Sequence, residues 1–224
     1  MSTPLPNILC SKGHGCFLVN PLSHHEYSFI AYAFEDDTDL VTSHHEHNVA
    51  LIVQCLQASL DTWEGSPNAT CGVVVREKTF WYLIDFQWDN GKWRYKTTAE
   101  TPASISVRNL EGERRTIKRY EVFEAQETLG IHLAPDGSTD AQADKMRDMA
   151  QRWADEIRTG KIACDESWLA IQSTIWRTLS YPLSAINLTE DQCDMTIRPI
   201  LTYGLPSIGV CHNYPRKLVY APKN

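Results

Sequence analysis

The stretch YSFIAYAFEDDTDLVT, residues 27–42, decides how the first part of this chain folds. Its aromatic and apolar run from Tyr27 to Phe34 is typical of a buried strand. An acidic cluster, Glu35 to Asp39, interrupts the run, and apolar residues return at Leu40 and Val41. The pattern of strand, acidic turn and strand predicts a β-hairpin with carboxylates at its tip.

Short elements are predicted on both sides of this hairpin. Residues 1–26 contain several prolines and glycines and are predicted to form a loop. After the hairpin, Ser43 and Glu46 have the spacing of a capping box, apolar residues recur at helical spacing, and Gly65 ends the predicted helix. Strands are then predicted at residues 71–75, 80–88, 92–96, 104–108, 116–123 and 128–133, with a hairpin turn at Asp89-Asn90-Gly91.

From Pro135 onward the pattern is helical. Thr139 with Gln142 and Thr189 with Gln192 are predicted capping boxes. The predicted helices cover residues 139–159, 165–181 and 189–198, the second capped by Asp165 and the third kinked or ended by Pro199. In the second helix the residues predicted to face inward are Trp168, Leu169, Ile175, Trp176 and Leu179. The sequence therefore predicts an α+β fold, with a mixed part at residues 1–134 and a helical part at residues 135–224.

Composition excludes several classes of function. No apolar run approaches the roughly 20 residues that span a bilayer, and the N-terminus lacks a secretory pattern, so we expect an intracellular protein without a membrane segment. The seven cysteines form no CxxC pair, which argues against a zinc ribbon. The formal charge is −7, and the densest basic stretch is Arg108 to Arg119. This balance argues against tight, autonomous binding of nucleic acid.

The acidic cluster is a candidate site for a divalent cation. Mg²⁺ binds through one or two carboxylates together with substrate phosphates, and two-metal phosphoryl transfer uses such a clamp. Asp36 and Asp37 are adjacent and follow an apolar strand directly, which is unusual for a surface turn. The other interpretation of the same residues is a solvated acidic hairpin.

Four segments, in order, resemble reverse transcriptases. Phe34-Glu35-Asp36-Asp37 resembles their aromatic-x-Asp-Asp motif, which lies on a hairpin of the palm, and residues 70–78 resemble the next palm element. Glu127 to Ile131 resembles the Leu-Gly element that starts the primer-grip region in retrotransposon enzymes of the non-LTR type. The predicted helices after residue 135 stand where this family has its thumb, so the resemblance extends over roughly residues 14–220.

The resemblance implies a fold, an activity and site residues. It implies part of a palm, made of a β-hairpin, a helix and antiparallel strands, followed by an all-helical thumb. Asp36 and Asp37 would bind Mg²⁺, and Lys78 would lie near the triphosphate and help to protonate the pyrophosphate leaving group. The implied activity is RNA-directed DNA synthesis from deoxynucleoside triphosphates on an RNA or DNA template-primer.

The sequence departs from the family pattern in two ways. The family's first catalytic aspartate lies on a strand well upstream of the hairpin, but residues 1–35 contain no aspartate. Glu35 also occupies a position at which the family usually has a small or apolar residue. We therefore expect a fragment of a retroelement reverse transcriptase that is inactive alone.

Two other functions stay open. A hydrolase with a His/carboxylate metal site would need His24 and His25 to approach His44, His45 and Glu46, although no HExxH pattern occurs. The alternative without catalysis is a folded α+β interaction module. If it lacks the part that normally covers its strands, it would expose an apolar surface and self-associate or recruit a partner.

Overall fold

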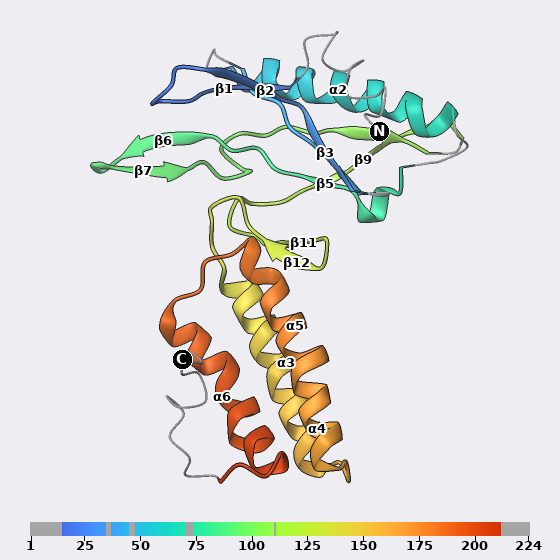
Figure 1. Cartoon of the computed structure of the whole chain (residues 1–224). Coiled ribbons are helices and arrows are strands. Elements are labelled where there is room, and N and C mark those ends of the chain that lie inside the picture. The colour runs from blue at the N-terminus through green and yellow to red at the C-terminus, as the bar shows by residue number, and fades with distance from the viewer. Residues whose placement is uncertain (1–14, 35–36, 45–47, 70–73, 110, 212–224) are drawn as a thin grey trace. The chain divides into compact units, whose positions relative to one another are not determined.

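The computed structural model describes residues 15–34, 37–44, 48–69, 74–109 and 111–211. Within them the fold is α+β, as the sequence predicts, and consists of helices and short strand pairs. The chain divides into two compact units, Met1–Val122 and Phe123–Asn224 (Figure 1). The predicted boundary at residue 134 falls within the second unit.

Two hairpins open the first unit. Strand β1 (Cys16–Val19) pairs antiparallel with β2 (Glu26–Phe29), and β3 (Ala31–Phe34) pairs antiparallel with β4 (Asp37–Leu40). The predicted loop over residues 1–26 is therefore wrong where β1 and the start of β2 lie. Asn20 organises the turn between β1 and β2, because its side-chain oxygen accepts hydrogen bonds from the backbone N–H groups of Leu22 and Ser23 at 2.8 and 3.1 Å.

Helix α2 (Val49–Ala69) begins later and ends later than the sequence predicts. Its first turn is capped by Asn48, whose side-chain oxygen accepts from the Leu51 N–H at 3.2 Å. The predicted capping box of Ser43 and Glu46 is therefore not at the start of α2, and Glu46 lies outside the described residues. The helix also continues through Gly65, where a glycine costs only about 1 kcal/mol relative to alanine.

The rest of the first unit is a series of short elements. They are the 3₁₀ turn η1 (Arg76–Lys78) and strands β5 (Phe80–Trp81), β6 (Phe86–Asp89), β7 (Lys92–Tyr95), β8 (Ser106–Arg108), β9 (Arg114–Thr116) and β10 (Lys118–Arg119). The predicted turn between β6 and β7 is confirmed, since Asn90 and Gly91 have φ values of 49° and 79°. The predicted strand over residues 80–88 is divided into β5 and β6, and β5 pairs in parallel with the distant β10.

Helix α2 packs against β4 and β8 and contributes Leu60 to the core of the first unit. The buried side chains are those of Leu60, Trp81, Leu83, Ile105, Val107 and Ile117. Polar side chains of α2 complete the contact with β8. Gln57 accepts from the Ser106 N–H and donates to the Ser106 carbonyl, both at 2.9 Å. Glu64 accepts from the Arg108 N–H at 2.7 Å.

The second unit starts with a hairpin and continues with helices. Its elements are β11 (Gln126–Thr128), β12 (Ile131–Leu133), α3 (Asp140–Thr159), α4 (Cys164–Ala170), the π-helical segment η2 (Ile171–Ile175), α5 (Trp176–Ser180), the 3₁₀ turn η3 (Tyr181–Ser184) and α6 (Glu190–Ser207). The core of this unit includes Met146, Ala150, Ala154, Ile175 and Ile200. None of the helices in the described part of the chain is long and apolar enough to cross a membrane.

The helix ends of the second unit differ in part from the prediction. The capping box of Thr189 and Gln192 is confirmed, with the Gln192 N–H donating to the Thr189 hydroxyl at 3.2 Å. At α3 it is wrong, because the Gln142 side chain is buried and accepts from the His132 N–H at 2.7 Å. Helix α6 passes through Pro199 and does not end there.

The start and the inward face of α4 also differ from the prediction. Asp165 lies inside its first turn, and the cap is at Ala163, whose N–H donates to the Glu166 carboxylate at 2.9 Å. Trp168 and Leu169 were predicted to face inward, but they are 51% and 64% exposed.

Candidate functional site

The acidic candidate site lies at the tip of the β3–β4 hairpin. Phe34 and Asp37 are backbone partners, so only Glu35 and Asp36 lie between the two strands in the sequence. Asp37 is thus the first residue of β4 and not part of the turn, whereas its side chain and all of Asp36 lie outside the described residues. The predicted hairpin is therefore confirmed, and the arrangement of its two carboxylates stays a prediction.

The base of this hairpin is held firmly. The Val41 N–H donates to the Ile30 carbonyl at 2.9 Å, which extends the pairing beyond β3 and β4. Ile30 is buried, and Leu40 packs against the core beneath α2. Gly15 has a φ of 114°, and a Cβ atom there would lie 2.7 Å from both an Ile30 side-chain carbon and the Phe29 carbonyl oxygen. Only glycine allows this close approach, which positions the start of the hairpin.

Lys78, the third predicted site residue, ends the 3₁₀ turn η1 and is exposed. This turn is held at both ends. The Lys78 N–H donates to the Val75 carbonyl at 3.1 Å, and the Arg76 Nε donates to the Thr116 carbonyl at 2.9 Å. The backbone at Lys78 is therefore fixed while its side chain extends into solvent. Gly72, which belongs to the same predicted palm element, lies outside the described residues.

The donor set at the hairpin tip suits a hard divalent cation. Asp36 and Asp37 offer carboxylate oxygens, the ligands that Mg²⁺ prefers, and one or two carboxylates are enough when phosphates complete the coordination. Elsewhere in the described part of the chain, no group of three or more His, Cys, Asp or Glu residues is placed to hold a metal ion. Glu26, an acidic residue upstream of the pair, begins β2 and is exposed.

The histidines of the alternative metal site lie on separate elements. His24 and His25 are at the turn of the β1–β2 hairpin, and His24 has a φ of 55°. His44 lies between β4 and α2 and is exposed. Residues 45–47, which include His45, Glu46 and His47, lie outside the described residues. The proposed convergence of these imidazoles stays a prediction.

Several basic residues of the stretch Arg108 to Arg119 make contacts that stabilise the fold of the first unit. Arg114 forms an ion pair with Asp61 of α2 at 2.9 Å, and Arg115 pairs with Glu113 at 2.6 Å. Arg119 stacks on the Trp81 ring at 5.2 Å from its centroid and donates to Thr101. Burial lowers the pKa of Arg119. These guanidinium groups therefore contribute to the fold of the first unit.

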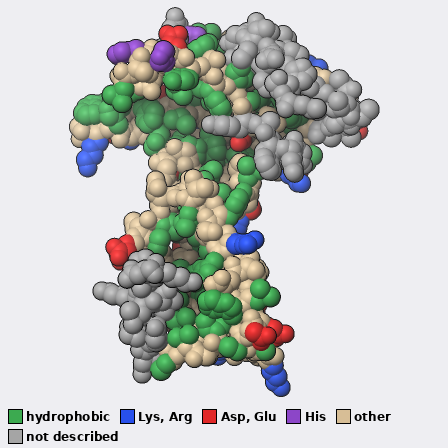
Figure 2. All heavy atoms as spheres, viewed as in Figure 1, with side chains coloured by type: hydrophobic (Ala, Val, Ile, Leu, Met, Phe, Trp, Pro, Cys, Tyr) green, Lys and Arg blue, Asp and Glu red, His purple; other side chains and the backbone are tan. Residues whose placement is uncertain are grey.

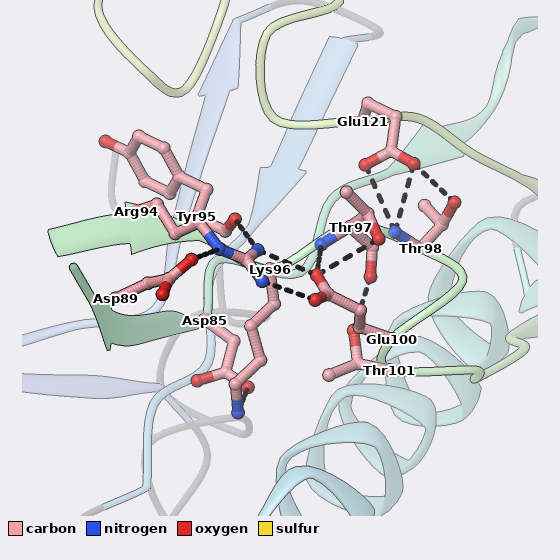
Figure 3. A network of polar contacts seen from close by, with 10 residues as sticks. All are labelled: Asp85, Asp89, Arg94, Tyr95, Lys96, Thr97, Thr98, Glu100, Thr101 and Glu121. Atoms are coloured by element: carbon pink, nitrogen blue, oxygen red, sulfur yellow. Dashed lines mark hydrogen bonds and ion pairs between the residues drawn. The ribbon is translucent and has the colours of Figure 1, made fainter.

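The β6–β7 hairpin is anchored by a polar network that no sequence motif described above predicts (Figure 3). Arg94 donates to both carboxylate oxygens of Glu100, at 2.9 and 2.5 Å. Glu100 also accepts from the Thr97 N–H at 2.8 Å. Lys96 forms an ion pair with Asp85 at 2.7 Å, and both side chains are largely buried. Thr97 and Glu100 have the spacing of a capping box, which is the sequence signal for this turn.

Hydrogen bonds stabilise the charged forms of Glu100 and Arg94. The bonds from Arg94 and from the Thr97 N–H lower the pKa of Glu100 to about 2. The same contact raises the pKa of Arg94. Both groups therefore stay charged at neutral pH, and their role is to orient the hairpin.

No family model, curated protein or solved structure matches the chain.

Proposed function

We propose that this chain is part of a reverse transcriptase core of the non-LTR retrotransposon type, and that it does not synthesise DNA by itself. The observation that carries the proposal is the β3–β4 hairpin. An apolar strand leads through a connection of Glu35 and Asp36 into Asp37, and the base of the hairpin rests on the core below α2. A helical unit with a capped helix α6 follows later in the chain, in the order expected for a thumb.

In this proposal each site residue has a defined role. Asp36 and Asp37 hold Mg²⁺, and the metal supplies charge neutralisation for the phosphates of the template-primer and the nucleotide. Lys78, with its fixed backbone and free side chain, donates a proton to the pyrophosphate that leaves. The third carboxylate that two-metal chemistry requires is an aspartate in the family, and residues 1–35 contain none. Because residues 1–224 supply only this pair, catalysis requires a third carboxylate from outside them.

The experiment combines metal binding with primer extension. Titration with Mn²⁺, followed by line broadening in NMR spectra, is expected to broaden the hairpin signals of the parent chain. Asp36→Asn/Asp37→Asn removes this effect, whereas Asp39→Asn, a matched change on the same strand, retains it. The parent chain with Mg²⁺, an RNA template and deoxynucleoside triphosphates is expected to give no extension above the level of the double variant.

Two results count against the proposal. Extension by the isolated chain that disappears in the Asp36→Asn/Asp37→Asn variant would show a complete catalytic site and overturn the claim of inactivity. Equal line broadening in the parent and in the double variant would show that Asp36 and Asp37 do not bind the metal. That result would overturn the assignment to the polymerase family.

The second candidate is an interaction module without catalysis. It is favoured by the exposure of large apolar side chains on the first unit, among them Leu22, Trp88 and Trp93, which are 92%, 61% and 68% exposed. In this function the Asp36→Asn/Asp37→Asn change leaves association unchanged. A change in the exposed aromatic residues abolishes it.

A further inference from the structure

The β6–β7 hairpin has an inverted polarity. Phe86 and Tyr95 form one cross-strand aromatic pair, with ring centroids 4.7 Å apart, and Trp88 and Trp93 form the next, at 5.2 Å. These pairs share one face of the ribbon, because side chains of alternate residues point to the same side. On that face Phe86, Trp88 and Trp93 are exposed and Tyr95 is half-buried. The opposite face is polar, with Gln87 and Arg94 half-buried and the residues at the hairpin end exposed. An exposed antiparallel ribbon normally has the reverse arrangement.

Polar contacts hold the aromatic face outward. Arg94 is bound by Glu100 on the half-buried face, and Lys96 by Asp85 beside it (Figure 3). The Asn90-Gly91 turn fixes the register, because both residues have positive φ values. A slip of one residue would turn the aromatic side chains inward but would break these ion pairs. The exposure of the aromatic rings is thus a defined feature of the fold and not a local failure of packing.

The exposed aromatic surface is of the size found at binding sites. Trp88, Trp93 and Phe86 are 61%, 68% and 46% exposed. With about 150–250 Å² for each aromatic side chain, these fractions leave about 400 Å² of aromatic surface in contact with water. The space-filling view shows hydrophobic side chains gathered over this hairpin (Figure 2). A contiguous apolar patch of this area is often functional.

The chemistry of this face points to a second copy of the same chain. The face carries no charge, and the charges of Arg94 and Lys96 near it are paired within the chain, so it has no electrostatic preference for an acidic or a basic partner. It is complementary to itself, because a two-fold axis places the edge of one indole against the ring of another. We propose that the aromatic face of β6–β7 is the contact surface of a reversible homodimer.

The area predicts that this dimer is weak. Two copies would bury about 800 Å² through the aromatic faces, which is less than the roughly 1,200 Å² of a stable interface. Each copy also carries a net charge of −7, so the two copies repel one another and salt strengthens their association. The dimer therefore forms in the micromolar range or above, and its fraction rises with ionic strength. This inference does not depend on the proposed polymerase origin.

Sedimentation equilibrium of the full chain over a range of concentrations tests the proposal. The parent is expected to follow a monomer–dimer equilibrium, and Trp88→Thr/Trp93→Thr is expected to weaken it at least tenfold. Threonine keeps the β-propensity of both positions. The matched control is Leu18→Thr/Tyr27→Thr, which changes a cross-strand pair of the β1–β2 hairpin that is 60% and 55% exposed. This control is expected to leave the dissociation constant unchanged.

A second measurement distinguishes loss of the dimer contact from unfolding of the hairpin in the double variant. With 5-fluorotryptophan in the parent chain, the ¹⁹F signals of Trp88 and Trp93, assigned by single substitutions, are expected to shift with protein concentration. The signals of Trp153 and Trp176, which pack against the core of the second unit, are expected to stay constant. A chain that is monomeric at every concentration overturns the proposal. So does a dimer that the tryptophan variant retains, or one that forms without any shift at Trp88 and Trp93.

Discussion

The contact between Gln57 of α2 and Ser106 of β8 gives a stability prediction with a magnitude. Gln57 both accepts from and donates to the backbone of Ser106, at 2.9 Å in each case. Gln57→Met keeps the length of the side chain and the helix propensity but removes both hydrogen bonds to Ser106. It also removes a bond from the Gln57 amide to Asp61 of the same helix, and such an i,i+4 pair contributes only about 0.2–0.5 kcal/mol. Each bond to Ser106 contributes about 0.5–1.5 kcal/mol net, so we expect the free energy of unfolding of the first unit to fall by about 1–3 kcal/mol.

Hydrogen exchange at the Ile117 amide is the assay, because this amide lies in the first unit and its bond to the Ile105 carbonyl, at 2.9 Å, does not involve the substituted side chain. A loss of about 1–3 kcal/mol corresponds to a roughly 5- to 150-fold increase in the opening equilibrium at this site. Gln54→Met is the matched control, since Gln54 lies one turn earlier on the same helix and is exposed. Surface changes of this kind alter stability by less than about 0.5 kcal/mol.

Equal exchange rates at the Ile117 amide in Gln57→Met and Gln54→Met would contradict this prediction. That result would mean that α2 is held on the strands by apolar packing alone. Faster exchange in the Gln57 variant, with the control unchanged, would show that the polar contact fixes the helix on β8.

Two further predictions concern the hairpin network and the helical core. Because hydrogen bonds from Arg94 lower the pKa of Glu100 to about 2, below its ordinary value of 4.5, this contact stabilises the hairpin fully above pH 4.5. Its contribution is lost as the pH falls from 4.5 to 2. The near-UV circular dichroism signal of the hairpin's tryptophan pair is expected to decrease over that range. The decrease is expected to be larger for the parent than for Glu100→Gln. In the second unit Ala150 is fully buried on α3, so Ala150→Leu is expected to lower stability by about 1–3 kcal/mol in urea denaturation. Ala141→Leu, at an exposed position of the same helix, is expected to be nearly neutral, and equal midpoints for the two variants would contradict the assigned packing.

Features that depend on neighbouring residues could be predicted from the sequence. The turn at Asn90-Gly91 follows from the low cost of positive φ at these two residue types. The capping box of Thr189 and Gln192 follows from side-chain reach within one helical turn. The acidic hairpin of β3 and β4 follows from an apolar run interrupted by charge. In each case the interactions that determine the structure are made between residues a few positions apart in the sequence.

The start of α2 and the capping box of α3 could not be predicted in this way. Helix α3 does begin after Thr139, as predicted, but the Gln142 side chain accepts from the backbone N–H of His132 and does not close the box. Helix α2 is capped by Asn48 and not at Ser43. A local capping rule considers partners within one helical turn only, whereas Gln142 finds its partner ten residues earlier in the chain.

The inward face of the helical run 164–184 was decided by tertiary packing. Hydrophobicity favoured Trp168 and Leu169, but the fully buried residue is Ser167, followed by Ile171, Ile175 and Leu179 at intervals of four. An α-helix repeats every 3.6 residues, so this spacing would drift around the axis, and the π-helical segment η2 compensates because its turns are wider. At Gly204 of α6 a Cβ atom would lie 3.0 Å from Ile171, so the two helices approach closely there.

The sequence by itself determined the α+β composition, the local turns and the acidic hairpin. Only the tertiary structure decided which face of each element is buried, including the outward aromatic face of β6–β7. The physical reason is that the periodicity of a sequence shows which residues are apolar but not which part of the chain packs against them. The choice of face depends on partners far along the chain, such as Glu100 for Arg94 and Gly204 for Ile171.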